Sequence, residues 1–345
     1  MIEKLLKDLI KIPSISKKEK EIAGFVCDYL KYHELKPKIS GNNIYCQIGK
    51  GKKSLLLNSH LDTVPPTGNW TLDPFKAKKL NGRIYGLGAC DAKASLAAMI
   101  DAAISLNNLK EELDGNIIFA ATCEEEDGND GFEKLIKKIN YDAVVIGEPT
   151  NLDNCIAEKG IVRLKIVATG KSAHAALGGI NAIHNAVNDI KKLSNIKFKK
   201  IHGLLGFPSI QTTIINGGIK KNMIPDNCEF ILDIRSTPTY TNSYLLDLIR
   251  KKTTSKIEII SNRILPKETD INEEIIQAAK KANQKAKISG FFATSDLAFA
   301  NKPGIILGPG NPKQAHTENE FVEISQLKKA SFIYQRIAKK FLSFN

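Results

Sequence analysis

Residues 116–126, NIIFAATCEEE, join a seven-residue, mainly apolar run to three consecutive glutamates. The run has the length and composition of a buried strand. Adjacent carboxylates repel one another, and burying them near a protein interior is costly unless cations or hydrogen-bond donors offset their charge. The chain must therefore fold so that partners of that kind meet the end of this strand.

Helical and strand patterns alternate around this run. The sequence predicts helices at 2–11, 19–33, 91–106 and 131–139, and strands at 54–60, 116–122 and 142–148. Strands that alternate with helices indicate a layered α/β sheet. In such sheets, ligands bind beyond the carboxyl ends of the strands.

The pattern changes near residue 160. Half-exposed, antiparallel-type strands are predicted at 163–170, 208–218, 228–235 and 257–261, with helices near 180–193 and 243–252 between them. The α/β pattern then returns, with a helix at 273–283, a strand from 304 and a closing helix at 325–341. We therefore expect a layered α/β domain made of residues 1–159 and 266–345, interrupted by an α+β, ferredoxin-like insert at 160–265.

Polar residues follow the predicted strands of the α/β domain, and all of them fall at one edge of its sheet. They are His60, Asp62, Asp91, Glu124, Glu125, Glu126, Glu148 and His316. One or two divalent cations would neutralise carboxylates that could not otherwise coexist there. Imidazole and carboxylate ligands suit zinc, and also cobalt or manganese. Asp62, two residues from His60, could orient that imidazole by accepting its second N–H.

These segments resemble the dinuclear-zinc exopeptidase and deacylase family that contains acetylornithine deacetylase, succinyl-diaminopimelate desuccinylase and carboxypeptidase G. The matching motifs span nearly the whole chain in the family's order. They are SHLDTVP (59–65), YGLGACDAK (85–93), CEEEDGNDG (123–131), IGEPT (146–150), GKSAHAA (170–176), NMIPDNCEFILDIR (222–235), TSD (294–296) and GPGNPKQAH (308–316). The insert lies where the family has its lid and dimerisation domain.

The resemblance implies a role for each residue that matches a family motif. Asp91 would bridge two metal ions, His60 and Glu148 would complete one site, and Glu126 and His316 would complete the other. Glu125 would be the general base and Asp62 would orient His60. The family usually has Asp-Glu-Glu-x-Gly-Ser where this chain has residues 124–129, so Glu124 remains a rival for the base.

The resemblance also implies a substrate and an assembly. His174 would stabilise the oxyanion from the partner subunit of a homodimer, and Arg235 and Asn222 would bind a substrate carboxylate. The expected reaction is hydrolysis of an N2-acyl amino acid, with acetylornithine of arginine biosynthesis as the first candidate. Three alternative substrates would use the same chemistry. They are succinyl-diaminopimelate, another acylated substrate of a lysine-pathway deacylase, and a peptide cleaved by a dipeptidase or carboxypeptidase. A non-catalytic relative is disfavoured because all ligand and base positions are filled.

Composition bears on partners and location. The net charge is +13, but the lysines stand in short, scattered pairs without aromatic residues between them, which favours a solvated surface over nucleic-acid binding. The sequence shows no run of 18 apolar residues and no signal peptide, so neither a membrane span nor export is expected, and a cytoplasmic location is. The six cysteines are expected to be reduced and mostly buried.

Overall fold

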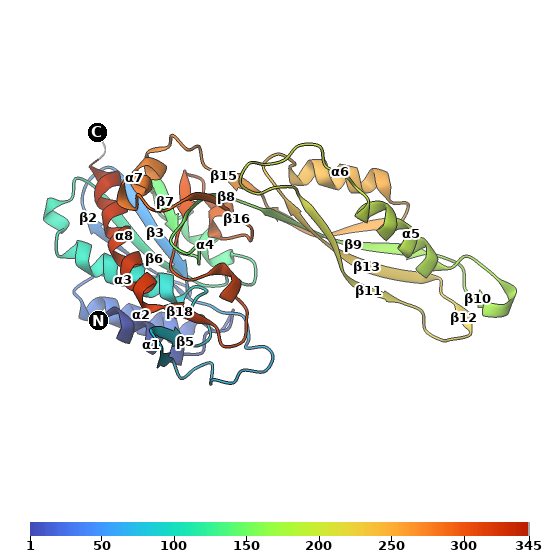
Figure 1. The fold of residues 1–345 in the computed structure, drawn as a ribbon, viewed down its shortest axis with the longest axis horizontal. Coiled ribbons are helices and arrows are strands. Elements are labelled where there is room, and N and C mark those ends of the chain that lie inside the picture. Colours follow the sequence, from blue (N-terminus) through green and yellow to red (C-terminus); the bar gives the residue numbers. More distant parts are fainter. Residues whose placement is uncertain (344–345) are drawn as a thin grey trace. The chain divides into compact units, whose positions relative to one another are not determined.

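The computed structural model describes residues 1–343 and divides into two compact units (Figure 1). The core unit comprises Met1–Ile156, Thr269–Phe291 and the described residues from Ser295 on. The insert unit comprises Ala157–Glu268 and Phe292–Thr294. The division expected from the sequence, at 160 and 265, lies three residues inside the bounds of the insert unit at each end.

A mixed sheet forms the centre of the core unit. Its strands are ordered β1-β2-β6-β3-β7-β17-β8, and β16 also pairs with β8. Their bounds are β1 Lys38–Ser40, β2 Asn43–Gly49, β3 Ser54–His60, β6 Asn116–Thr122, β7 Ala143–Ile146, β8 Asn154–Glu158, β16 Ile288–Phe291 and β17 Gly304–Ile306. Strand β3 is parallel to β6 and β7, and β17 is parallel to β7. The carboxyl ends of these four strands therefore meet at one edge of the sheet.

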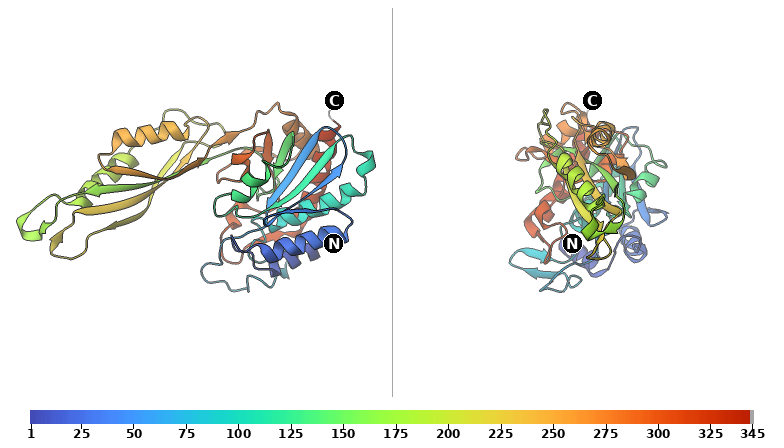
Figure 2. Two further views of the ribbon diagram at one scale, coloured as in Figure 1. Left: turned by 180° about the vertical axis from the view of Figure 1, so that it is seen from behind. Right: turned by 90° about the vertical axis from the view of Figure 1, so that its right-hand side faces the viewer.

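Helices cover both faces of this sheet, as Figures 1 and 2 show. They are α1 Ile2–Lys11, α2 Lys20–Tyr32, α3 Lys93–Asn107, α4 Asp130–Leu135, α7 Glu274–Ala282 and α8 Ile324–Leu342. Helix α3 is buried on almost all sides because its alanines let α1, α8 and β3 approach it closely. Helix α4 packs Phe132 and Leu135 against Leu56, Ile118 and Val144 of the sheet. This arrangement confirms the predicted layered α/β fold.

Short elements complete the core unit, and the sequence patterns did not predict them. Strands β4 Lys78–Leu80, β5 Arg83–Tyr85 and β18 Phe321–Glu323 form a separate antiparallel sheet. The short 3-10 helices are η1 Lys110–Glu112, η3 Asp296–Phe299 and η4 Pro312–Gln314. Elements of two to four residues are too short to show a hydrophobic period.

The insert unit has the predicted β-α-β-β-α-β order. Its main elements are β9 Gly160–Thr169, α5 Ala182–Ser194, β11 Ser209–Gly217, β13 Asn227–Ser236, α6 Asn242–Lys252 and β14 Lys256–Ile264. The sheet order is β11-β13-β9-β14 and all three pairings are antiparallel. A two-residue pairing of β10 Ala173–His174 with β12 Met223–Ile224 extends one end, beside η2 Ala175–Leu177, and β15 Lys267–Glu268 pairs with the end of β8.

Within residues 1–343, no helix combines the length and the apolar character that a membrane crossing requires.

Candidate metal centre

Five of the predicted site residues converge at the carboxyl edge of the core sheet. His60 is the last residue of β3, Glu126 lies in the turn after β6, and Glu148 follows β7 by two residues. Asp91 lies in the turn that leads into α3, and His316 lies in the loop between η4 and β18. Parallel strands place their carboxyl ends together, which is why residues so far apart in sequence meet here.

The five residues form two groups that share Asp91. His60, Asp91 and Glu148 make one group, and Asp91, Glu126 and His316 make the other; in each group the possible ligand atoms lie within 4.8 Å of one another. The two carboxylate oxygens of Asp91 serve different groups. Its Oδ1 lies 3.2 Å from Nε2 of His60, and its Oδ2 lies 3.5 Å from Nε2 of His316. Asp91 therefore has the geometry of a carboxylate that bridges two cations.

Within each group, an imidazole faces a second carboxylate. Nε2 of His60 lies 3.7 Å from Oε1 of Glu148, and Nε2 of His316 lies 3.0 Å from Oε1 of Glu126. His60 and Glu148 are buried, whereas the side chain of His316 is 51% exposed. The first group is therefore enclosed, while the second opens toward solvent.

The electrostatics of the cluster reflect an excess of buried negative charge. Burial alone would lower the pKa of His60, but Glu148, Asp62 and Asp91 outweigh it and raise that pKa well above the usual value. Burial raises the pKa of Glu148 well above its usual value, and Asp91 adds to the rise. A hydrogen bond to Glu126 is the main reason that the pKa of His316 rises to about 9.

Divalent cations fit this donor set. Three carboxylates and two imidazoles supply oxygen and nitrogen ligands only, a combination that suits zinc, cobalt and manganese. Protons on the imidazoles and carboxyls provide the compensating charge where no cation does. A pair of cations would replace those protons and let every carboxylate ionise.

Two other carboxylates bind the backbone of residues 124–126, the acidic turn that follows β6. Oε1 of Glu19 accepts the N–H of Glu124 at 3.1 Å, and Asp62 accepts those of Glu125 at 3.1 Å and Glu126 at 3.0 Å. Glu124 adopts a left-handed backbone with φ +59°, which starts the turn. The three glutamates are therefore tied at their peptide N–H groups, and their carboxylates stay available to other partners.

The contacts of Asp62 differ from the expectation in one respect. Its backbone oxygen lies 2.9 Å from Nδ1 of His60, whereas the carboxylate Oδ1 lies 3.6 Å from the same nitrogen. The carboxylate is occupied by the acidic turn and by the hydroxyl of Ser16 at 2.7 Å. Asp62 therefore contacts His60 mainly through its main chain, and its side chain fixes the segment that carries Glu125 and Glu126.

Glu125 belongs to neither ligand group and has its own supporting contacts. The side-chain amide of Asn129 donates to Oε1 of Glu125 at 2.9 Å and to Oδ1 of Asp296 at 3.1 Å. Asp296 is buried and also accepts hydrogen bonds from Asn58 at 2.8 Å and Thr122 at 3.0 Å. Burial raises the pKa of Glu125 well above its usual value; His60 opposes the rise, and Glu126 adds to it.

Glu320 holds the loop that carries Asp91. Its buried carboxylate accepts the backbone N–H groups of Gly88 at 2.9 Å, Cys90 at 2.6 Å and Asp91 at 2.8 Å. Sequence reasoning missed Glu19, Asn129, Asp296 and Glu320 as members of the site. Asn129 and Asp296 lay inside quoted motifs, CEEEDGNDG and TSD, and Glu320 stands four residues after His316, whereas no pattern marked Glu19.

The remaining predicted residues lie in the insert unit, at opposite ends of its sheet. His174 is exposed and pairs with Met223 in the β10–β12 extension; the exposed Asn222 accepts the N–H of Ala175 at 3.0 Å. Arg235 lies near the other end of β13, where its Nε donates to Oδ1 of Asp233 at 2.6 Å. Arg235 is eight residues along β13 from Asn227, which corresponds to roughly 26 Å.

Comparison with known proteins agrees with this geometry. The model of the peptidase family M20/M25/M40 matches residues 56–340. An acetylornithine deacetylase of Buchnera aphidicola subsp. Schizaphis graminum is 31% identical, over 98% of this chain and 97% of that protein. A probable succinyl-diaminopimelate desuccinylase of Staphylococcus aureus strain MSSA476 is 26% identical, over 98% of this chain and 97% of its own length.

Solved structures share the fold. An M20 family metallo-carboxypeptidase from Sulfolobus solfataricus superimposes with a TM-score of 0.83 at 21% identity, over 99% of both chains. A dinuclear metal binding M20 peptidase from Bacillus subtilis gives a TM-score of 0.79 at 19% identity, over 100% of this chain and 98% of that one.

Proposed function

This chain belongs to peptidase family M20/M25/M40 and is a metal-dependent amide hydrolase, and on that premise we propose that it removes the acyl group from an N2-acyl amino acid, acetylornithine first. The observation that carries the proposal is the arrangement around Asp91. Two complete ligand groups share this one carboxylate, and an unshared acid, Glu125, lies beside them.

The proposed metal ligands are His60, Asp91 and Glu148 for one divalent ion and Asp91, Glu126 and His316 for the other, with zinc first and cobalt or manganese as alternatives. When bound, such a pair supplies Lewis acidity that activates a water molecule and polarises the amide carbonyl of the substrate. Asp62, Glu19 and Glu320 keep the ligand-bearing turns in place through the backbone contacts described above.

Glu125 is the proposed general base. Its carboxylate accepts a proton from the attacking water and afterwards donates that proton to the departing amine nitrogen. Glu125 fits this role better than Glu124 because its carboxylate lies within the electrostatic reach of His60 and Glu126 and is hydrogen-bonded to Asn129.

Asn129→Ser tests the support of the base, since serine is the residue that the resemblance led us to expect there. A hydroxyl has one hydrogen to donate and cannot bridge Glu125 and Asp296 as the amide does. We expect kcat to fall by about tenfold, with a smaller change in KM, because a misplaced base affects the transition state more than binding. Thr67→Ser, on an exposed loop, is the matched control. An unchanged kcat in Asn129→Ser would refute the role of the bridge.

Arg235 is the proposed ligand of the substrate carboxylate. Burial lowers the pKa of the nearby Lys159, and the half-buried guanidinium of Arg235 adds to that shift. An arginine and a lysine at one place favour an anionic group there, and the arginine fork can bind carboxylate through two hydrogen bonds.

The distances within the insert unit support a homodimer. His174 and Asn222 lie beyond the end of the sheet at which β13 begins, and Arg235 is roughly 26 Å along β13 from Asn227 at that end, so one insert unit cannot bring all three to one substrate. We propose that a second copy supplies His174 and Asn222, and that His174 donates a hydrogen bond to the developing oxyanion.

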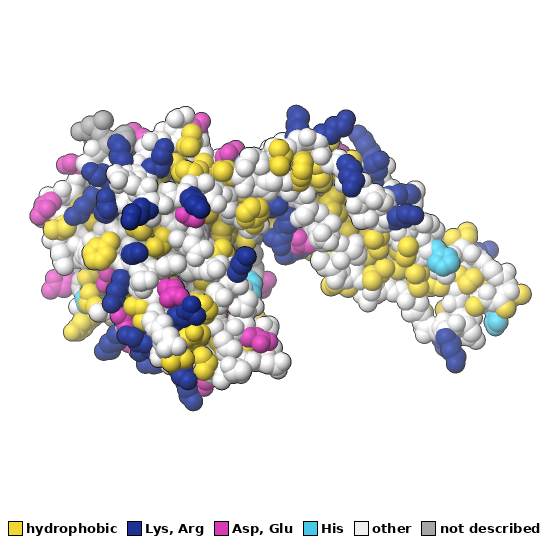
Figure 3. Space-filling view, viewed as in Figure 1, with side chains coloured by type: hydrophobic (Ala, Val, Ile, Leu, Met, Phe, Trp, Pro, Cys, Tyr) yellow, Lys and Arg dark blue, Asp and Glu magenta, His cyan; other side chains and the backbone are white. Residues whose placement is uncertain are grey.

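Strand β11 is the proposed edge for this association. It is at the edge of the insert sheet and exposes Ile214 (55%) and Ile215 (48%), and Val187 of α5, a helix that contacts β11, is also exposed (51%). Figure 3 shows hydrophobic side chains along the length of the insert unit. An open edge strand with apolar side chains pairs readily with another copy of itself.

The double variant Ile214→Lys, Ile215→Lys should therefore be a monomer and lose most of the activity, because charge on an edge strand blocks pairing. The matched control places lysines at Ile259 and Ile260 of β14, the opposite edge, which are exposed to a similar degree. Light scattering coupled to gel filtration and turnover at several protein concentrations measure both effects. A dimer that survives in the β11 variant, or is lost in both, would place the interface elsewhere.

Complementation tests the shared site directly. A mixture of His174→Ala and Glu125→Gln chains should regain about a quarter of wild-type activity, since half of the dimers are mixed and each has one intact site. A mixture as inactive as its parents would show that His174 acts within its own chain or has no catalytic role.

The substrate is tested by amine release from a panel of acylated amino acids, using zinc- or cobalt-loaded protein. The panel contains acetylornithine, acetylcitrulline, succinylornithine, succinyl-diaminopimelate and a dipeptide. Preference for an acylated ornithine or citrulline would support a role in arginine biosynthesis. Preference for succinyl-diaminopimelate or the dipeptide would assign the desuccinylase or peptidase activity instead, with the same metal centre.

A further inference from the structure

Most of the net positive charge of the chain lies on the insert unit. Residues 157–268 contain 18 Lys and Arg against 8 Asp and Glu, and so account for +10 of the net +13 on about a third of the chain. Figure 3 shows many of these cationic side chains along one side of the insert unit, where Figure 1 has α5 and α6. The excess is therefore a local feature of one unit.

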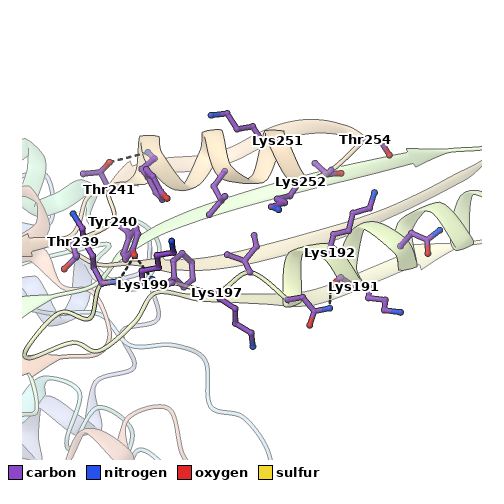
Figure 4. Close-up of a pocket in the computed structure, with 18 residues that line it drawn as sticks. Lys191, Lys192, Lys197, Lys199, Thr239, Tyr240, Thr241, Lys251, Lys252 and Thr254 are labelled. Atoms are coloured by element: carbon purple, nitrogen blue, oxygen red, sulfur yellow. Dashed lines mark hydrogen bonds between the residues drawn. The ribbon is translucent and has the colours of Figure 1, made fainter.

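A groove between α6 and the segment that follows α5 collects seven of these lysines (Figure 4). The groove has a volume of about 1300 Å³, and none of the described residues that line it is acidic. The lysines are Lys191, Lys192, Lys197, Lys199, Lys200, Lys251 and Lys252. Within residues 1–343, only Lys192 among them has an ion-pair partner, the buried Asp189 at 3.5 Å. The pairs that look scattered in the sequence thus meet on one surface.

Helix stabilisation explains only part of this cluster. Lys191 and Lys192 lie in the last turn of α5, and Lys251 and Lys252 lie in that of α6, where cations favour the helix dipole. Lys197, Lys199 and Lys200 belong to no helix. Their segment is nevertheless fixed, because the hydroxyl of Tyr240 accepts the backbone N–H of Lys199 at 2.9 Å and of Lys200 at 2.8 Å.

We propose that this lysine groove binds an acidic, extended segment of another protein. The groove is larger than the roughly 300–1000 Å³ typical of small-molecule sites, so a stretch of chain fits it better than a single metabolite. Ile196, Phe198 and Leu248 supply apolar contacts between the lysines for the side chains that separate the acidic residues. A second copy of this chain would be repelled if it presented the same lysines to the groove. The expected partner therefore carries negative charge.

The aromatic residues favour a polypeptide over a nucleic acid. Phe198 packs on Tyr240 with ring centroids 5.0 Å apart, and Tyr240 packs on Tyr244 at 5.3 Å. Tyr244 is 51% exposed, but Tyr240, the ring between it and Phe198, is 8% exposed, so the three rings form no continuous row of free faces on which successive bases could stack. No arginine is among the described residues that line the groove, although arginine is the usual residue for paired hydrogen bonds to phosphate and bases.

Fluorescence anisotropy with the full-length protein tests the proposal independently of catalysis. The probe is a labelled peptide in which glutamates alternate with leucine and serine, and its control has glutamine at every glutamate. The groove variant combines Lys197→Glu, Lys199→Glu and Lys200→Glu. Its matched control makes the same charge change at Lys36, Lys38 and Lys110, three exposed lysines of the core unit. Titrations at about 150 mM salt limit non-specific attraction, and turnover confirms that each variant is folded.

We expect the acidic peptide to bind the wild type and the control variant equally, and the groove variant at least about tenfold more weakly. The glutamine peptide should not bind to any of them. An equal loss in both variants would show that net charge alone attracts the peptide, and absence of binding at this salt would also refute the proposal. Tighter binding of single-stranded RNA than of the acidic peptide, lost only in the groove variant, would assign the groove to nucleic acid instead.

Discussion

Glu125→Gln is expected to lower kcat by about 10²- to 10⁴-fold, the range that general acid–base groups contribute. Glutamine preserves the shape of the side chain and can still accept the hydrogen bond from Asn129 through its amide oxygen. It cannot accept a proton from water or return one to the amine. KM should change little, because the carboxylate acts on the transition state and is not a proposed ligand of the metals or of the substrate.

Glu124→Gln is the matched control, since the two glutamates are neighbours in the same turn. It should retain most of the activity, because Glu124 supports the turn through its backbone N–H, which donates to Glu19. The substitution leaves that backbone group unchanged. Both variants should bind the same amount of metal, as measured by mass spectrometry of the purified proteins. Loss of kcat in Glu124→Gln with an active Glu125→Gln would exchange the two assignments.

Removal of the metals should abolish activity and lower the melting temperature. A ligand that binds only the native state stabilises it by about 4 kcal/mol at a free concentration a thousandfold above Kd. The effect should be large here because the carboxylates of both groups lie close together around Asp91. Differential scanning fluorimetry with and without a chelator measures it, and added zinc or cobalt should restore both properties.

The same binding should weaken as the pH falls. Without metal, the pKa of His60 and that of Glu148 are raised well above their usual values, so both groups hold protons that a cation must displace. Affinity should therefore rise with pH until these groups are deprotonated, and fall as the pH drops through their raised pKa values. Glu148→Ala should lose most of the chelator-sensitive stabilisation, whereas Glu125→Gln should keep it. A melting temperature that no chelator moves would contradict the metal centre.

The long core strands were predictable because their sequences are continuous apolar runs that end in polar residues. For β3 and β6 the predicted bounds, 54–60 and 116–122, are the observed ones. Helix α4 is shorter than predicted, ending at Leu135 rather than 139. Strands such as β18, with three residues, are too short to show a hydrophobic period, and only tertiary pairing defines them.

The convergence of the five candidate ligands was predictable for the same reason, since parallel strands bring their carboxyl ends together. The roles of the supporting residues Glu19 and Glu320 were not predictable, because their partners are backbone N–H groups of distant segments. Glu19 is a charged residue next to a helix start, and nothing local indicates that it holds Glu124, 105 residues away. The contacts of Lys93 could not be predicted either. It is buried in α3 and donates hydrogen bonds to the carbonyl oxygens of Leu9 and Ile12.

The position of β17 in the core sheet has a consequence for synthesis on the ribosome. This strand lies between β7 and β8, pairing with both, yet about 150 residues and the whole insert unit separate it from them in the chain. A nascent chain thus carries an unfilled gap at the middle of its sheet until the last tenth or so of the protein emerges. The insert unit, whose strands are close in sequence, can form earlier, so the order of assembly reverses the order of the two units in the chain.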